Sequence, residues 1–351
     1  MMLDWTLKYW VVFSFLMYGL SVASIGIYYS YALNRGILDL PNSRSAHKVV
    51  TPRGGGLPLV LLWGIFLGVV IYYFQLPYQI GLIFGPAMIV GYVGYLDDRQ
   101  SRSALFRLGV HIFSAMIMLW ALGVSQIEVL FPPNFSSLVP IWALFLGVII
   151  GIVWFTNLFN FMDGMDGIAG TEAIFFFGLA AYIFWQLDSE ILMLLSWGLV
   201  ALLAGFLTWN WPPARIFLGD TGSGFLGLLM ATFALIGSIW YGVSIFVWLI
   251  ISGVFWFDAS FTLMRRLLKK ENILTAHASH AYQRLLQRQF SHRTVLLMII
   301  SVNSFLAWMA YMAFQQPELG LTLFAYAGMF LTGLYLIVEY LKPMFKTWHP
   351  T

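Results

Sequence analysis

Long apolar segments, separated by short polar ones, recur along the whole chain. A helix needs about 20 predominantly apolar residues to cross the hydrocarbon core of a bilayer. By this criterion the pattern predicts about eleven transmembrane helices, over residues 8–33, 55–74, 78–95, 105–123, 138–157, 167–186, 191–208, 216–237, 241–264, 294–314 and 318–341. We therefore expect an all-α polytopic integral membrane protein that forms one transmembrane domain over residues 1–351.

Some of the apolar segments are less simple than the rest. Gly and Pro residues interrupt the apolar run 78–95, and only a very short turn at Ile239-Trp240 separates the spans 216–237 and 241–264. The first apolar run has no basic segment before it and no small-residue cleavage site after it. We therefore expect it to remain as the first span rather than to be removed as a signal peptide.

The composition supports a membrane protein and narrows the chemistry. The chain is 60% hydrophobic and only 9% charged, whereas soluble domains carry about 25% charged residues. A soluble core of this size could not cover so much apolar surface. The sequence contains no cysteine, which excludes disulfide bonds and thiolate metal ligands.

The distribution of basic residues predicts the orientation. Cytoplasmic loops of membrane proteins carry an excess of Lys and Arg. If the N-terminus lies outside, every one of the 18 Lys and Arg residues except Lys8 falls on the inner side. We therefore expect the N-terminus outside and the C-terminus in the cytoplasm.

Acidic residues gather on the same inner side. The outer connections hold only single ones, Glu128, Asp188, Glu190 and Glu318. The inner connections hold acidic residues beside glycine, asparagine or arginine, namely Asp39, Asp97, Asp98, Asp163, Asp166 and Asp220. Because carboxylates at a membrane boundary are costly to desolvate and tend to be functional, we expect these loops to form one composite site.

The pair Asp97-Asp98 ends the third predicted span. Two adjacent carboxylates repel each other, which raises one pKa unless a cation lies between them. A bound Mg²⁺, or a positioned proton donor and acceptor, would resolve this repulsion. Arg99, Arg102 and Arg107 follow on the same loop, and one of them could bind a pyrophosphate.

The segment 157–170 has polar residues at a regular spacing. Asn157, Asn160, Asp163 and Asp166 follow one another at intervals of three. If the fifth helix extends that far, all four lie on one of its faces. Oxygen ligands at this spacing suit a hard cation or the hydroxyl and imide groups of a nucleoside.

Two glycine-containing loops suit a phosphate. His47 and Arg53 precede the glycines at 54–56, where backbone N–H groups and cations could bind an anion. Asp220 opens the eighth span within Gly-Asp-Thr-Gly-Ser-Gly, so it could cap that helix, contribute to a metal–phosphate site, or do both.

The longest inner loop carries His277 and His280, followed by Arg284 and Arg288. The two histidines could bind zinc, but no third ligand of the usual kind is evident. Contacts between the imidazoles and a phosphate or sugar fit the neighbouring arginines better. Asp258 could pair with one of the arginines that follow it or serve the site, and the sequence leaves both open.

Together these motifs resemble those of the polyprenyl-phosphate N-acetylhexosamine-1-phosphate transferases (glycosyltransferase family 4). The five motifs occur in family order up to about Arg288. Asp97-Asp98 resembles the family's aspartate pair, and Arg107 stands where some members carry a basic residue that contacts the pyrophosphate. The segment 157–167 resembles the central signature, and 277–280 resembles the histidine motif, although its histidines are not contiguous.

The resemblance implies a role for each motif and a reaction. Asn160 and Asp220 would bind Mg²⁺, with Mn²⁺ as an alternative, and Asp163 and Asp166 would lie near the uridine. The implied reaction transfers N-acetylhexosamine-1-phosphate from a UDP-sugar to undecaprenyl phosphate and releases UMP. It would take place at the cytoplasmic face of a bacterial inner membrane. No nucleic-acid partner is expected, and a homodimer is left open.

The resemblance leaves the branch of the family open. Arg99-Gln100-Ser101 stands where the branch that transfers phospho-N-acetylmuramoyl-pentapeptide carries a lysine. This departure is more similar to the branch that initiates O-antigen and other polysaccharides of the cell envelope. The muramoyl-pentapeptide reaction remains an alternative.

Two further classes are alternatives. A CDP-alcohol phosphotransferase would need an Ala-Arg pair where the chain has Gly170-Thr171. A lipid-phosphate transporter would place ionisable residues near the bilayer midplane, whereas here they lie at the ends of the predicted spans.

The orientation can be tested with single cysteines, because the sequence has none of its own. Cysteines introduced at Ser101 and Ser189 should react with an impermeant maleimide from opposite sides of the membrane, Ser189 from outside. Labelling of both positions from outside would refute the predicted topology.

Overall fold

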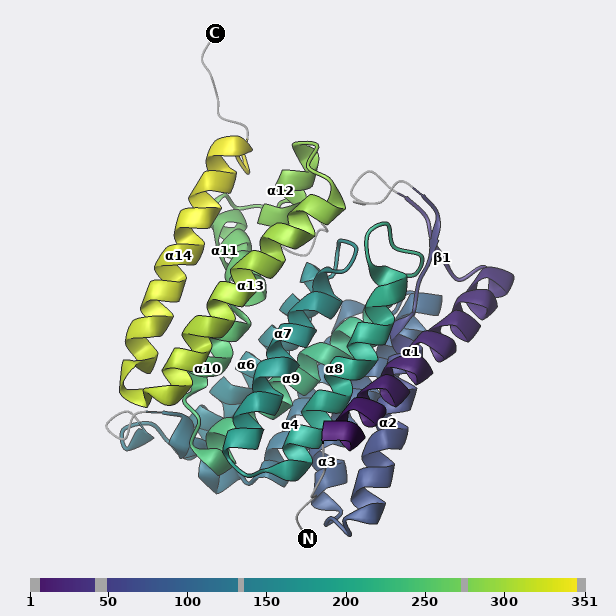
Figure 1. Cartoon of the computed structure of the whole chain (residues 1–351). Helices are drawn as coiled ribbons and strands as arrows, with labels where there is room; N and C mark the ends of the chain where they lie inside the picture. The colour runs from purple at the N-terminus through teal and green to yellow at the C-terminus, as the bar shows by residue number, and fades with distance from the viewer. Residues whose placement is uncertain (1–6, 42–48, 132–135, 273–276, 346–351) are drawn as a thin grey trace.

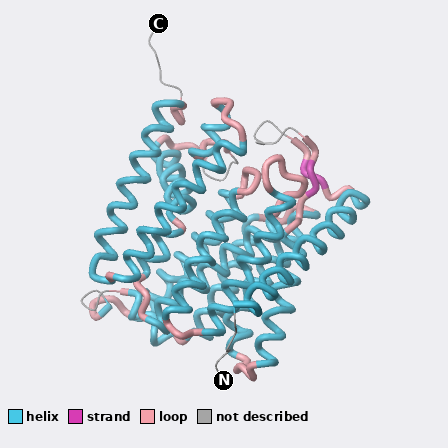
Figure 2. The backbone as a smooth tube through the Cα atoms, in the orientation of Figure 1, coloured by secondary structure: helices cyan, strands magenta, loops and turns pink. Residues whose placement is uncertain are grey.

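The computed structural model describes residues 7–41, 49–131, 136–272 and 277–345, and within these ranges the chain is almost entirely helical (Figure 2). The α-helices are α1 Leu7–Arg35, α2 Gly56–Tyr73, α3 Gln79–Arg99, α4 Ala104–Leu122, α6 Ile141–Met162, α7 Ile168–Gln186, α8 Glu190–Asn210, α9 Gly219–Tyr241, α10 Ile245–Ile251, α11 Gly253–Leu268, α12 Ala281–Gln287, α13 His292–Gln315 and α14 Gly320–Leu341. Two 3₁₀ helices, η1 Val124–Leu130 and η2 Pro317–Leu319, and two short strands, β1 Leu38–Asp39 and β2 Thr51–Pro52, complete the described elements.

The prediction of an all-α polytopic membrane protein is confirmed. In the described ranges 10 helices are long and apolar enough to cross a membrane, and the bent pair α10–α11 raises the number to 11. The helices form a bundle in which α1 begins near one end and α14 finishes at the other (Figure 1). We call the end that carries β1, α12 and the last turn of α14 the site end.

Helix α9 is the centre of the bundle. Nearly all of its residues are buried, and it packs against α2, α3 and α6. Gly94 of α3 permits the closest of these approaches, since a methyl group there would overlap the backbone of Asp220. Small residues at helix contacts allow such close packing within membranes. The first turn of α9 is therefore held firmly against the end of α3.

Three details differ from the sequence prediction. α3 is continuous from Gln79 to Arg99 with Pro86 inside it, as neighbouring helices often allow in membrane proteins. α9 extends through Ile239-Trp240 to Tyr241, and the turn follows at Gly242, whose φ of 68° suits glycine. The ninth span is broken, because α10 and α11 meet at 80°.

Polar groups from three helices surround the break between α10 and α11. The hydroxyl of Ser252 donates to the carbonyl of Trp248 at 2.7 Å. Glu172 of α7 is fully buried near the backbone N–H of Phe255, and it accepts a hydrogen bond from the side-chain amide of Asn303 of α13 at 2.6 Å. Unpaired backbone groups are costly inside a membrane, so these contacts stabilise the break.

Candidate active site

Asp98 binds the N-terminus of α9 with its side chain. One carboxylate oxygen accepts the backbone N–H of Asp220 at 3.0 Å. The other accepts the N–H of Thr221 at 3.1 Å and its hydroxyl at 2.7 Å. The first N–H groups of a helix have no partner within the helix, and a carboxylate there is also favoured by the helix dipole. Asp98 therefore caps α9 from the end of α3 and positions Asp220, while its catalytic role stays a prediction.

The glycines at 54–56 serve backbone packing rather than an open phosphate site. The N–H groups of Gly55 and Gly56 donate to the carbonyls of Phe217 and Leu218, both at 2.8 Å. Arg53, expected to bind substrate, donates two hydrogen bonds to the backbone carbonyl of Asp98. This loop therefore fixes the start of α9 against the end of α3. His47, the other expected residue of this loop, lies outside the described residues.

Arg107 joins two carboxylates that are far apart in sequence. Its Nη1 lies 3.1 Å from Asp97 and 2.8 Å from Asp220. Asn160 completes the group, because its side-chain amide donates to Asp220 at 3.0 Å and to Ser223 at 2.8 Å. The side chains of Arg107 and Asp220 are each 33% exposed, so a ligand can reach them. The sequence predicted all of these residues except Ser223.

Only two of the four polar residues that the sequence predicts on one face of the fifth helix lie on that helix. α6 ends at Met162, so Asn157 and Asn160 lie on it, whereas Asp163 is its C-terminal cap and Asp166 lies in the following turn. Asn157 donates to the carbonyl of Val153 at 2.7 Å. The helix ends here because the turn 163–167 reverses the chain into α7.

Asp163 lies in that turn among three other carboxylates. Burial, followed by the negative charges of Asp220, Asp98 and Asp166, raises its pKa from 3.8 to about 8. The side chain is thus held largely neutral at pH 7 unless a cation binds nearby. The chain brings these four residues together from three separate loops, as expected for one composite site.

Asp166 is more constrained than the sequence suggested. It is buried, accepts the N–H of Ala214 at 3.1 Å, and lies 3.2 Å from Nδ1 of His292. It therefore ties the loop before α9 and the start of α13 to the turn 163–167. Sequence analysis missed His292, because no motif surrounds it.

The histidine segment is held by Asp258, which resolves the question left open by the sequence. Asp258 accepts the N–H of Ala281 at 2.8 Å and lies 3.5 Å from Nδ1 of His280. The rings of His277 and His280 are 4.9 Å apart. Burial, with smaller contributions from His280 and Arg266, lowers the pKa of His277 to about 4. His277 is therefore neutral at physiological pH.

Arg284 does not face the cluster of carboxylates. It is 2% exposed, and its Nη1 lies 2.5 Å from Glu339 of α14. The expectation that Arg284 binds substrate is therefore corrected. Its side chain joins α12 to the last helix, because α12 turns this face away from Asp163.

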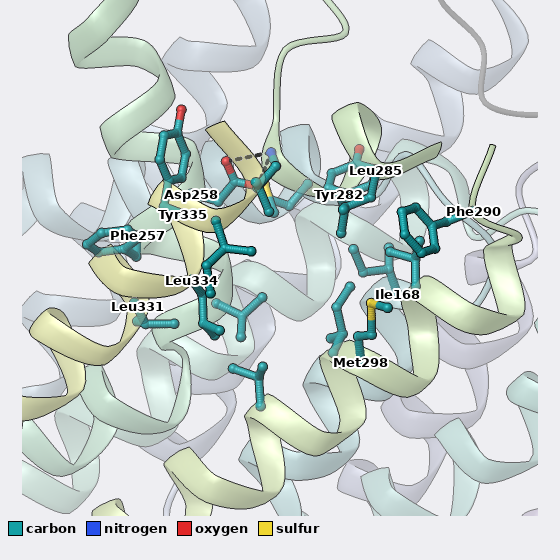
Figure 3. Close-up of a pocket in the computed structure, with 18 of the residues that line it drawn as sticks. Ile168, Phe257, Asp258, Tyr282, Leu285, Phe290, Met298, Leu331, Leu334 and Tyr335 are labelled. Atoms are coloured by element: carbon teal, nitrogen blue, oxygen red, sulfur yellow. Dashed lines mark hydrogen bonds between the residues drawn. The ribbon is translucent and has the colours of Figure 1, made fainter. Parts of the chain in front are cut away.

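An apolar pocket of about 280 Å³ adjoins the site between α11, α12, α13 and α14. Asp258 and Tyr282 lie at its polar rim, and side chains such as Leu334, Met298 and Phe290 line the rest (Figure 3). Met162 and Ile168, on either side of the turn 163–167, also line it. An apolar chain could therefore approach this turn from within the bundle.

The donor atoms at the site suit a magnesium ion that also binds substrate. No three His, Asp or Glu side chains in the described ranges are placed to hold a metal by themselves. Mg²⁺ usually binds one or two carboxylates plus substrate phosphates rather than a complete protein cage. Asp220 and the amide oxygen of Asn160 provide such a set, and the contact between Arg107 and Asp220 shows that a cationic group can reach this carboxylate.

Comparison with known proteins adds independent information. A family model described as Glycosyl transferase family 4 matches residues 80–238. The chain is 32% identical over 302 residues to a protein of Bacillus subtilis named probable undecaprenyl-phosphate N-acetylglucosaminyl 1-phosphate transferase, covering 84% of this chain and 81% of that one.

Two further relatives are more distant. An undecaprenyl-phosphate alpha-N-acetylglucosaminyl 1-phosphate transferase of Thermotoga maritima is 26% identical, covering 78% of this chain and 80% of its own. A phospho-N-acetylmuramoyl-pentapeptide-transferase of Kocuria rhizophila is 31% identical but covers only 45% of this chain and 52% of its own.

The two adjacent aspartates should respond differently to the same substitution. Asp98→Ala should lower the melting temperature in detergent, because it removes an acceptor of three hydrogen bonds, each worth about 1.5–3 kcal/mol when one partner is charged. Asp97→Ala, its matched control, removes an acceptor of two hydrogen bonds, from the N–H of Arg102 and from Arg107, and should lower the melting temperature less. Equal melting temperatures for the two variants would contradict the capping role of Asp98.

Asp163 should make the fold less stable as the pH rises. Below about pH 4 the carboxyl of Asp163 is protonated in both the folded and the unfolded protein. Between about pH 4 and pH 8 it ionises freely only in the unfolded protein, so the free energy of unfolding falls as the pH rises through this range. Asp163→Asn should therefore melt higher than wild type at pH 8.5 in EDTA, with a smaller difference at pH 5. A difference that is equal at both pH values would show that repulsion at Asp163 is not the cause.

Proposed function

Because the chain belongs to glycosyl transferase family 4, we propose that it transfers N-acetylhexosamine-1-phosphate from a UDP-sugar to undecaprenyl phosphate. The products are undecaprenyl-diphosphate-sugar and UMP. One observation carries the proposal: Arg107 bridges Asp97 and Asp220 at the site end, beside Asn160. This cluster combines the cationic and oxygen groups that phosphoryl transfer needs.

The reaction needs one bond formed and one broken. An oxygen of the lipid phosphate attacks the sugar-linked phosphorus of the donor, and the bond from that phosphorus to the bridging oxygen of UMP breaks. A phosphate monoester has its second pKa near about 6, so the acceptor is already largely dianionic at neutral pH. No general base is required, and UMP leaves with the electron pair of the broken bond.

The residues of the cluster then act by position and charge. Arg107 would bind the pyrophosphate through its guanidinium, and Asp97 would hold that guanidinium in place. Asn160 and Asp220 would hold Mg²⁺, or Mn²⁺ as a substitute, which when bound offsets negative charge on the pyrophosphate. Asp163 and the neutral His277 would bind the uridine and sugar parts of the donor.

The apolar pocket beside the site supports a lipid acceptor. It lies among helices long enough to span a membrane, and it reaches the residues that flank the turn 163–167. A prenyl chain there would remain in an apolar medium while its phosphate meets the polar cluster. A soluble acceptor would have no use for such a pocket.

The cellular setting follows from the same proposal. The donor would come from the cytoplasm, so the site end would face the cytoplasm of a bacterial inner membrane, in agreement with the basic loops. We place the reaction at the start of O-antigen or related envelope polysaccharide synthesis. Transfer of phospho-N-acetylmuramoyl-pentapeptide is the second candidate, and the partial match to the Kocuria rhizophila protein is the observation that favours it.

Purified protein, undecaprenyl phosphate and Mg²⁺ should be incubated with UDP-N-acetylglucosamine, UDP-N-acetylgalactosamine and UDP-N-acetylmuramoyl-pentapeptide in turn. We expect UMP and a lipid-linked sugar from an N-acetylhexosamine donor only. Product from the pentapeptide donor alone would support the second candidate. Movement of lipid phosphate across vesicles without release of UMP would identify a transporter.

Asp220→Ala should abolish transfer, by about 10³-fold or more, because it removes a carboxylate from the proposed metal and phosphate site. Glu128→Ala, an acidic residue away from the site end, should retain full activity. The capping contact of Asp98 uses the backbone of residue 220, so the variant should stay folded. Activity that persists with an unchanged dependence on Mg²⁺ would restrict Asp220 to a structural role.

A further inference from the structure

The carboxylate of Glu339, in the last turn of α14, accepts hydrogen bonds from several donors. Arg265 of α11 binds it through two nitrogens, at 2.6 and 2.9 Å. Arg284 of α12 reaches the same carboxylate at 2.5 Å, and the N–H of Met344 donates to it at 3.2 Å. One side chain thus connects three helices and the segment that follows α14.

Arginines of α12 also bind the end of α14 directly. Arg284 donates to the carbonyl of Lys342 at 3.0 Å, and Arg288 donates to the carbonyl of Leu341. The last carbonyls of a helix lack partners within it, and cations there are favoured by the helix dipole. The guanidinium of Arg284 further stacks on Tyr335, 4.6 Å from the ring centroid. One face of α12 is therefore attached to α14.

The opposite face of α12 adjoins the candidate active site. Tyr282 is buried with its hydroxyl directly against Gly164, where a methyl group would overlap it. His280, at the start of the helix, lies beside Asp258. Since α12 has only seven residues, and isolated helices shorter than about 12–15 residues are marginal in water, its place depends on these two attachments.

We propose that Glu339 is a positioning residue for the donor site. By pairing with both Arg265 and Arg284 it holds α12 on α14. α12 in turn holds Tyr282 against Gly164 of the turn 163–167 and His280 beside Asp258. Without the negative charge, the two guanidinium groups would lose the carboxylate that they share. Arg284, which is only 2% exposed, would then be a buried cation without its acidic partner, which is strongly unfavourable. The role in the donor site rests on the function proposed above; the attachment of α12 does not.

The attachment is tested first by hydrogen exchange on the full-length protein in detergent, without substrates. In Glu339→Gln, peptides covering 281–287 should exchange about ten times faster than in wild type, while peptides of α9 stay unchanged. Glu339→Asp, which keeps the charge, should restore much of the protection. Glu318→Gln, the same change before the other end of α14, should have no effect. Unchanged exchange in 281–287 would overturn the proposal, whatever the activity.

The effect on the donor site is tested by steady-state kinetics on the same variants. Glu339→Gln should raise KM for the UDP-sugar about five- to ten-fold. KM for undecaprenyl phosphate should rise as well, because α12 and α14 also line the apolar pocket. A merely destabilised protein would lose apparent kcat with both KM values unchanged, and that result would reject the positioning role. If wild type turns over no UDP-sugar, the proposed function fails, while the exchange data still decide whether Glu339 attaches α12.

Discussion

The capping of α9 by Asp98 is the contact on which the candidate site depends. The carboxylate accepts the N–H groups of Asp220 and Thr221, and this fixes the first turn of α9 at the end of α3. Only with that turn in place can the side chain of Asp220 meet Arg107 and Asn160. Gly219 is part of the same arrangement: its φ of 74° favours glycine, and a Cβ there would overlap the carboxylate of Asp98. The geometry of the cluster formed by Asp220, Arg107 and Asn160 thus begins with hydrogen bonds to the backbone of α9.

The spans could be predicted closely because length and apolar character alone decide whether a helix can cross a membrane. The gathering of acidic residues at one end could be predicted too, since it follows from the order of the spans. The role of each polar side chain could not, because its partners come from distant segments. Asp98 looked like a catalytic group and also caps α9, and Arg284 looked like a substrate ligand and binds Glu339. The break between α10 and α11 was also missed. Ser252-Gly253 marks it in the sequence, but two small residues alone do not show whether a span bends.

At two places in the site, a carboxylate of one helix caps the N-terminus of another helix. Asp98 caps α9, and Asp258 caps α12 through the N–H of Ala281 while it contacts His280. Each carboxylate belongs to one helix, binds the N-terminus of another, and thereby sets the place of a residue in the site. Folding and chemistry therefore share the same acidic residues. Loss of activity in a variant of Asp98 or Asp258 does not by itself assign a chemical role, and a measurement of folding is needed beside it.

The 80° break between α10 and α11 has a mechanical consequence. A hinge needs backbone groups that can exchange partners, and inside a bilayer no water is present to supply replacements. Here the hydroxyl of Ser252 donates to the carbonyl of Trp248 at 2.7 Å, and the indole N–H of Trp256 donates to the carbonyl of Leu249 at 2.6 Å. The carbonyls next to the break therefore have partners within the protein, and in this bent arrangement α11 holds Asp258 beside His280.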